Sequence, residues 1–278
     1  MQPKGSPLTI GAIGAAAIAV ALLAGCASSP QQDAAPTTAA DASDGAQLSG
    51  TLTVSAAASL QPAFEQLAED FSELHPGVEF EHLAFDGSSV LATQIIGGAP
   101  VDVFASADEK NMAKVVGEGL VTADPIAFAT SSLQIAVAPG NPLGIETLAD
   151  LATPRANGTP PVVVICAPEV PCGAASQQLL ERDGVALEPA SEEQNVTAVL
   201  TKVAGGEADA GLVYRSDVLR ADGDVEGIEI EGSIEAAGRY LIAPLSGSQA
   251  PEAAAAFAAF MTTPGAQRLL EELGFGPA

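Results

Sequence analysis

A short apolar segment followed by a helical pattern occurs three times in succession between residues 51 and 117. The apolar segments have the composition of strands and span residues 51–56, 78–84 and 101–105. The segments with apolar side chains at helical spacing span residues 62–74, 89–96 and 108–117. Strands that alternate with helices are typical of α/β layers around a mainly parallel sheet. The repeat therefore predicts an α/β fold.

A second group of strand and helix patterns lies between two apolar segments that are far apart in sequence, residues 133–138 and 240–243. Within it, strand patterns cover residues 162–165 and 210–214, and helix patterns cover residues 176–181 and 196–203. We expect this group to form a second α/β lobe inserted into the first, to which a last helix at residues 251–261 returns. The expected partition is residues 51–132 and 240–278 in lobe 1, and residues 133–239 in lobe 2.

The first 25 residues have the order of a secretory signal. Lys4 is their only charge, and an apolar run over residues 8–24 ends in Leu-Ala-Gly-Cys at Cys26. This ending resembles the bacterial lipobox, so we expect cleavage before Cys26 and a lipid on its thiol. An uncleaved anchor or an ordinary signal with a chance cysteine would export the domain equally. Residues 26–50 are rich in small and polar residues and are expected to be a disordered tether. The predicted location is extracytoplasmic, on the cell membrane.

The chain is strongly acidic, with 35 Asp and Glu against 10 Lys and Arg and a net charge of −25. Such a charge argues against nucleic acid and against an anionic membrane surface as partners. It does not exclude a small anion as ligand, because long-range fields are screened over about 10 Å at ordinary salt. Local hydrogen-bond donors decide whether a buried site accepts an anion.

Two of the predicted strands lead into serine-bearing starts of helices. Ser59 follows the first strand and Ser88 follows the second, each just ahead of a helical pattern. Both positions suit an N-cap, where a hydroxyl and unpaired backbone N–H groups converge, and such helix starts bind anions. Ligands of open α/β sheets bind beyond the carboxyl ends of the strands, where both turns would lie. The two serines therefore either share one anion or only cap their helices.

An ordered set of motifs resembles those of the bacterial molybdate-binding proteins. The motifs are residues 54–60 (VSAAASL), 87–95 (GSSVLATQI), 98–108 (GAPVDVFASAD), 169–173 (EVPCG) and 211–217 (GLVYRSD). They follow the family's order and spacing over nearly all of residues 51–275. The resemblance implies a two-lobed periplasmic-binding-protein fold of type II, with the ligand in the cleft between the lobes. It further implies a solute-binding protein that captures molybdate, and tungstate as well, for the membrane permease of an ABC importer.

The same resemblance implies a ligand site made of hydrogen-bond donors only. The hydroxyl and main-chain N–H of Ser59 and Ser88, the N–H of Cys172 and Val196, and the Tyr214 hydroxyl would bind the oxyanion. Cys172 stands where better-known members have alanine, but a backbone donor survives that change. No cationic side chain, cofactor or metal-cation ligand is expected, and neither is a second subunit.

Asp86 bears on which oxyanion would bind. Molybdate and sulfate are both fully deprotonated acceptors at neutral pH, so sulfate or another tetrahedral oxyanion is the alternative ligand. Partly protonated phosphate would need an acceptor, and the Asp86 carboxylate would supply one if it pointed into the site.

Two further features of the sequence remain. Cys166 and Cys172, six residues apart, are expected to form a disulfide in an exported protein, the alternative being two free core thiols.

The rival function is an exported hydrolase that uses Ser59 or Ser88. An activated serine needs a nearby base, and the only histidines, His75 and His82, lie outside every motif. We therefore expect that the protein is not an enzyme.

Overall fold

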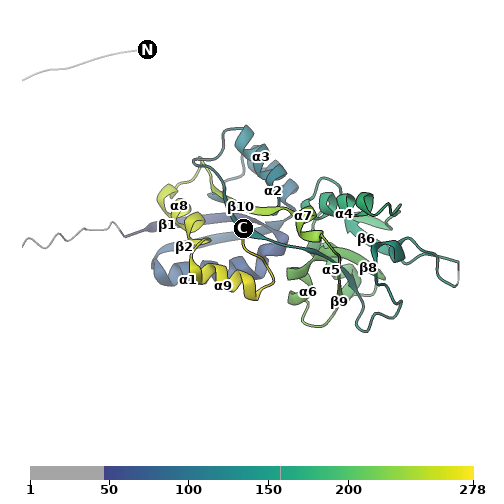
Figure 1. Ribbon diagram of the computed structural model, residues 1–278. Helices are drawn as coiled ribbons and strands as arrows, with labels where there is room; N and C mark the ends of the chain where they lie inside the picture. The colour runs from purple at the N-terminus through teal and green to yellow at the C-terminus, as the bar shows by residue number, and fades with distance from the viewer. Residues whose placement is uncertain (1–46, 157) are drawn as a thin grey trace, which may run out of the picture. The chain divides into compact units, whose positions relative to one another are not determined.

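The structure is a computed structural model that describes residues 47–156 and 158–278. Its strands form two sheets of five, each with helices packed against it (Figure 1). The predicted α/β fold is therefore confirmed. The predictions for the signal peptide, for Cys26 and for most of the tether fall outside the described residues. Residues 49 and 50, which were expected in the tether, begin the first strand.

The first sheet has the strand order β2-β1-β3-β10-β4. Its strands are β1 (Ser49–Ala57), β2 (Gly77–Asp86), β3 (Val103–Ser106), β4 (Ile126–Thr130) and β10 (Arg239–Pro244). Its helices are η1 (Ala58–Leu60, a 3-10 turn), α1 (Gln61–Leu74), α2 (Ser88–Ile96), α3 (Glu109–Gly117), α8 (Pro251–Phe260) and α9 (Pro264–Glu272). We call this sheet with its helices the first lobe.

Each face of the first sheet carries its own apolar core, as the alternation along β3 shows. Val103 and Ala105 belong to the core that α1, α8 and α9 cover, where Phe64 and Phe257 pack edge to face with ring centroids 6.0 Å apart. Phe104, between them in sequence, belongs to the core that α2 and α3 cover. Because successive side chains of a strand point to opposite faces, this fully buried strand needs helices on both sides.

The second sheet has the strand order β7-β6-β8-β5-β9. Its strands are β5 (Leu133–Val137), β6 (Val163–Cys166), β7 (Ser191–Glu193), β8 (Ala210–Tyr214) and β9 (Glu226–Glu229). Its helices are η2 (Leu148–Leu151, a 3-10 turn), α4 (Pro171–Arg182), α5 (Val196–Ala204), α6 (Arg215–Arg220) and α7 (Ser233–Ala237). We call this sheet with its helices the second lobe.

Both sheets are mixed, so the expectation of a mainly parallel sheet was wrong. In the first lobe β1 pairs in parallel with β2 and β3, but β10 is antiparallel to β3 and β4. In the second lobe β5 is antiparallel to β8 and β9. The reason is the passage of the chain between the lobes: β4 leads out of the first sheet and β10 leads back in, with Thr130 paired to Arg239. A chain that leaves and returns at one edge must run in opposite directions there.

No helix of the described residues is long and apolar enough to cross a membrane.

Candidate functional site

A small cavity lies where the turns of the two lobes meet. The space in it that a water molecule can occupy is only about 10 Å³. It is lined by Ala57, Ala58, Ser59, Asp86, Gly87, Ser88 and Ala107 of the first lobe, and by Val170, Pro171, Cys172, Val196 and Tyr214 of the second. Such a volume holds about one water molecule, so the turns of the two lobes stand close together around the site. The lining brings together all five residues that the sequence predicted.

Four of the five predicted residues stand at the starts of helices. Ser59 is the second residue of η1, Ser88 the first of α2, Cys172 the second of α4 and Val196 the first of α5. The first N–H groups of a helix have no acceptor within it, and the partial positive charge of the helix dipole is greatest there. Four sets of backbone donors therefore surround one cavity, two from each lobe.

Neither serine caps its helix with its side chain, which corrects one expectation. The capping positions are held by Ala57 and Gly87, and no side-chain cap is formed at either. Because the serines lie inside the first turn, their hydroxyls are turned elsewhere. The Ser88 oxygen accepts a hydrogen bond from the Ala107 N–H at 3.0 Å. The Ser88 hydroxyl hydrogen remains available to a ligand.

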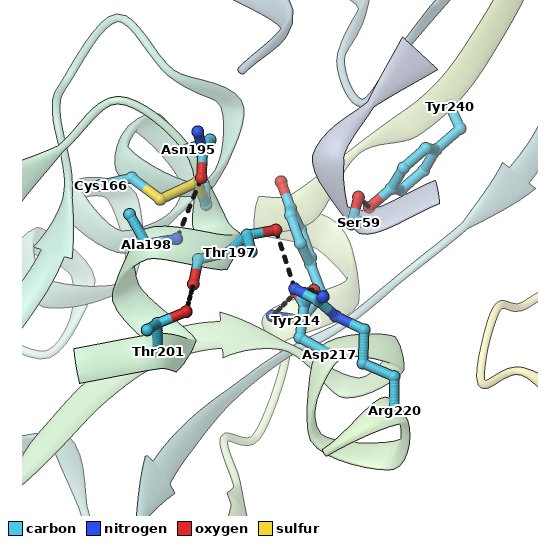
Figure 2. Close-up of polar contacts among 11 residues, drawn as sticks. Ser59, Cys166, Asn195, Thr197, Ala198, Thr201, Tyr214, Asp217, Arg220 and Tyr240 are labelled. Atoms are coloured by element: carbon cyan, nitrogen blue, oxygen red, sulfur yellow. Dashed lines mark hydrogen bonds and ion pairs between the residues drawn. A yellow bond between two sulfur atoms is a disulfide. The ribbon is translucent and has the colours of Figure 1, made fainter. Parts of the chain in front are cut away.

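The Ser59 hydroxyl pairs with a residue that sequence reasoning missed. Its oxygen lies 3.0 Å from the hydroxyl of Tyr240, and both side chains are buried. Figure 2 shows the two hydroxyls facing each other. Tyr240 was assigned to an apolar strand only. No local signal indicates that its hydroxyl would meet Ser59, because the contact joins segments 181 residues apart.

Tyr214 ends β8 with its hydroxyl at the cavity. The side chain is buried, and within residues 47–156 and 158–278 its hydroxyl has no hydrogen-bond partner. Burial raises the pKa of Tyr214 well above its ordinary value, so the phenol keeps its proton and remains a donor. A buried donor without a partner is costly, so a ligand with acceptor atoms in the cavity would stabilise the Tyr214 hydroxyl.

Asp217 and Arg220 hold the turn that presents Tyr214. The Asp217 carboxylate accepts the Tyr214 N–H at 3.0 Å and forms an ion pair with Arg220 at 3.0 Å (Figure 2). Burial raises the pKa of Asp217 to about 6, against the opposing effect of Arg220. Arg220 also donates to the hydroxyl of Thr197 in α5 at 2.9 Å. Its charge is thus engaged by Asp217, and it is not among the residues that line the cavity.

Asp86 lies in the cavity wall, but one of its oxygens is already engaged. Its Oδ1 accepts hydrogen bonds from the Gly87 N–H at 2.7 Å and from the Asn195 side-chain amide at 2.8 Å. Asn195 was not predicted as functional. Its position just ahead of the helical pattern at residues 196–203 is the N-cap signal that could have found it, and its Oδ1 does accept the Ala198 N–H at 3.0 Å.

The two remaining cysteines are joined by a disulfide, as expected from the sequence. It links Cys166 at the end of β6 to Cys172 in the first turn of α4. Packing here is tight, because a Cβ atom added at Gly173 would lie 1.9 Å from the carbonyl oxygen of Ala167. The bond therefore fixes the start of α4, which carries the Cys172 N–H, against the end of the sheet.

No Lys or Arg is among the residues that line the cavity. In the part of the chain that the structure describes, no three His, Cys, Asp or Glu side chains are grouped so that they could hold a metal ion. Neither histidine lines the cavity, and His75 packs against Phe71 with ring centroids 4.6 Å apart. A larger surface hollow on the second lobe, around Arg182 and Glu231, contains none of the predicted site residues.

A model of the family described as bacterial extracellular solute-binding protein matches residues 52–276. The molybdate-binding protein ModA of Mycobacterium tuberculosis is 44% identical over 225 residues, which cover 81% of this chain and 84% of that protein.

Solved structures show the same fold. The periplasmic molybdate-binding protein of Azotobacter vinelandii superimposes with a TM-score of 0.66 at 22% identity, covering 82% of this chain and 99% of that one. The sulfate-binding protein SubI of Mycobacterium tuberculosis superimposes with a TM-score of 0.67 at 22% identity, covering 82% and 87%. At such identities the likeness concerns the fold alone, and it is shared by proteins named for different oxyanions.

Proposed function

The chain belongs to the family of bacterial extracellular solute-binding proteins, and we propose from this that it captures molybdate outside the cytoplasm and delivers it to the permease of an ABC importer. Tungstate, a second fully deprotonated tetrahedral oxyanion, is included in the proposal. The observation that carries it is the cavity in which helix starts from both lobes meet the buried, unpartnered hydroxyl of Tyr214.

The chemistry of the lining supports an oxyanion as ligand. The proposed donors are the hydroxyl and N–H of Ser59 and Ser88, the N–H of Cys172 and of Val196, and the Tyr214 hydroxyl. Backbone dipoles and hydroxyls that are already in place stabilise a charge locally and need little reorganisation. A site of this kind needs no Lys or Arg, which agrees with a chain of net charge −25.

Calorimetric titration with molybdate, tungstate, sulfate and phosphate tests the ligand. We expect molybdate and tungstate to bind most tightly, because the 44% identical ModA is named for molybdate and both ions present only acceptor oxygens. Sulfate shares that property and is the second candidate. Phosphate has a proton to donate and would favour a site with a free acceptor. Tighter binding of sulfate or phosphate than of molybdate would overturn the assignment.

The proposed moving parts are two lobes, residues 51–132 with 240–278, and residues 133–239. Membership of the two sheets supports this partition, since β1 to β4 and β10 form one and β5 to β9 the other. Closure of the lobes on the anion would bring both sets of donors to the ligand, and the closed form would dock on the permease as a monomer. Sedimentation with and without molybdate should give the mass of a single chain.

We also propose that a lipid on Cys26 holds the protein on the cell membrane. The support is the Leu-Ala-Gly-Cys sequence after an apolar run and the polar stretch that follows it. Cys26→Ser should leave the protein unprocessed or release it from the membrane, as detergent partitioning would measure. Unchanged partitioning of the variant would contradict the proposal.

A catalytic role is not part of this proposal. The two serines face a cavity that neither histidine lines, so no imidazole base stands beside them. Turnover assays with ester and phosphoester substrates should give no activity above background, and Ser59-dependent or Ser88-dependent turnover would overturn this reading.

A further inference from the structure

We propose that Asp86 and Asn195 form an interlobe latch that positions the donors of Ser88 and Val196 on one ligand and slows its release. The inference rests on the proposed oxyanion-binding function. Asp86 ends β2 in the first lobe, two residues before Ser88. Asn195 is the N-cap of α5 in the second lobe, one residue before Val196. Their side chains meet at 2.8 Å across 109 residues of sequence.

The backbones beside this hydrogen bond also touch. A Cβ atom added at Gly87 would lie 2.1 Å from the carbonyl oxygen of Gln194 and 3.3 Å from a methyl carbon of Val170. Only a glycine at position 87 allows these two backbone segments to approach so closely. The turn at residues 86–88 is therefore seated directly on the turn at residues 194–196, and the side-chain bond fixes their register.

Asn195 is held at both ends of its amide. Its oxygen accepts the Ala198 N–H at 3.0 Å and so caps α5, while its nitrogen donates to Asp86. The side chain that caps the start of α5 thus also bonds the opposite lobe. Any movement that separates the lobes must break the bond to Asp86, whereas the cap can persist. This makes the bond a contact of the closed arrangement and not of either lobe alone.

The charge of Asp86 gives the latch a second effect. A carboxylate in the wall of an anion site repels the ligand unless donors engage it. Two donors, the Gly87 N–H and the Asn195 amide, converge on its Oδ1. Loss of the Asn195 donor would therefore both free the lobes and leave the carboxylate less neutralised beside the anion.

The test is the release rate of radiolabelled molybdate after a chase with unlabelled molybdate. Asn195→Asp keeps a good N-cap but replaces the donor by a second carboxylate. A hydrogen bond to a charged group carries roughly a tenfold to hundredfold effect, so we expect this variant to release molybdate faster by that factor. Asp86→Asn keeps the acceptor without its charge and should accelerate release less.

The double variant Asp86→Asn with Asn195→Asp is the matched control. It exchanges the two groups, so that the amide at position 86 donates to the carboxylate at position 195. We expect release to return most of the way to the parent rate, which a purely structural role for either residue would not produce. A parent-like rate in Asn195→Asp, or a double variant as fast as Asn195→Asp, would overturn the latch.

A second measurement separates failure of the latch from failure of the proposed function. If the parent protein does not bind molybdate, the proposed ligand is wrong, and the latch is then read from small-angle scattering of the ligand-free proteins. Asn195→Asp should give a larger radius of gyration than the parent, and the double variant a radius close to the parent. Equal radii in all three proteins would overturn the latch independently of any ligand.

Discussion

The hydroxyl oxygens of Ser59 and Tyr240 lie 3.0 Å apart in the protein interior. Burial raises the pKa of Tyr240 far above its ordinary range, so its phenol stays protonated. If the phenol donates to the Ser59 oxygen, the Ser59 hydrogen is directed to the cavity that Ser59 lines. Tyr240 thus lies behind the site and orients one of its proposed donors.

Tyr240→Phe should weaken molybdate binding modestly, because it removes this orienting bond but no ligand contact. A typical hydrogen bond contributes about 0.5 to 1.5 kcal/mol, which corresponds to roughly a twofold to tenfold loss of affinity. Isothermal titration calorimetry measures this change in molybdate affinity. In a Ser59→Ala background the same change should have no further effect on affinity, and full additivity of the two losses would contradict the proposed orientation.

Ser59→Ala and Ser88→Ala should each weaken molybdate binding roughly tenfold to hundredfold, since a hydrogen bond to a charged group is worth about 1.5 to 3 kcal/mol. Ser233→Ala is the control, because Ser233 is equally buried but does not line the cavity. Thermal unfolding should show that all three variants fold. Parent-like affinity in both Ser59→Ala and Ser88→Ala would show that the site lies elsewhere.

Replacing Cys166 and Cys172 together by Ser should lower the free energy of unfolding by about 2 kcal/mol, the chain-entropy value for so short a loop. In a chain of this size the loss corresponds to a fall in Tm of roughly 4 to 8 °C. Molybdate affinity should fall less than in the serine variants, because the backbone N–H at position 172 remains. An unchanged Tm, compared with that of the parent under reducing and non-reducing conditions, would contradict a stabilising disulfide.

Stability should depend on pH through Asp217. Its folded-state pKa of about 6 lies above the ordinary value of 3.8, so the folded protein binds the proton more tightly than the unfolded chain does. Between about pH 4 and pH 6 the contribution of Asp217 to stability therefore falls as pH rises, by about 3 kcal/mol in all. The variant Asp217→Asn has no titrating group at this position and therefore lacks this pH-dependent contribution to the unfolding free energy.

The measurement is chemical denaturation of the parent and of Asp217→Asn at a series of pH values. The difference in unfolding free energy between the two proteins should change across this window, in favour of the variant as pH rises. A difference that stays constant from pH 4 to pH 7 would show that Asp217 does not titrate there.

The strands that the sequence missed share one property: β4, β7 and β9 all lie at sheet edges. An edge strand buries less of its surface, and β7 (SEE) and β9 (EGIE) accordingly lack an apolar pattern. By contrast, the interior strand β8 is buried at every residue, and its bounds at residues 210–214 were predicted without error. Burial on both faces makes a strand easy to predict from its sequence, whereas of the four edge strands only β2 was predicted.

In the candidate site, too, some features could be predicted from the sequence and others could not. Ser59 and Ser88 were found because a serine between a strand and a helix is a local pattern, and the helix starts could be placed from it. Their actual hydrogen bonds, to Tyr240 and to the Ala107 N–H, depend on how distant segments pack and could not be read from either neighbourhood. The same applies to the contact of Asp86 with Asn195.

The pairing of Thr130 with Arg239 has a consequence for how such a molecule can change over time. Everything between these partners is one continuous stretch of chain that enters and leaves through neighbouring strands of a single edge. A recombination event with both crossover points there would exchange the whole second lobe without cutting the first sheet. The proposed donors of Ser59 and Ser88 would be inherited unchanged, while those proposed at Cys172, Val196 and Tyr214 would be replaced together. A single exchange of this kind could therefore change the ligand preference by replacing one side of the proposed site.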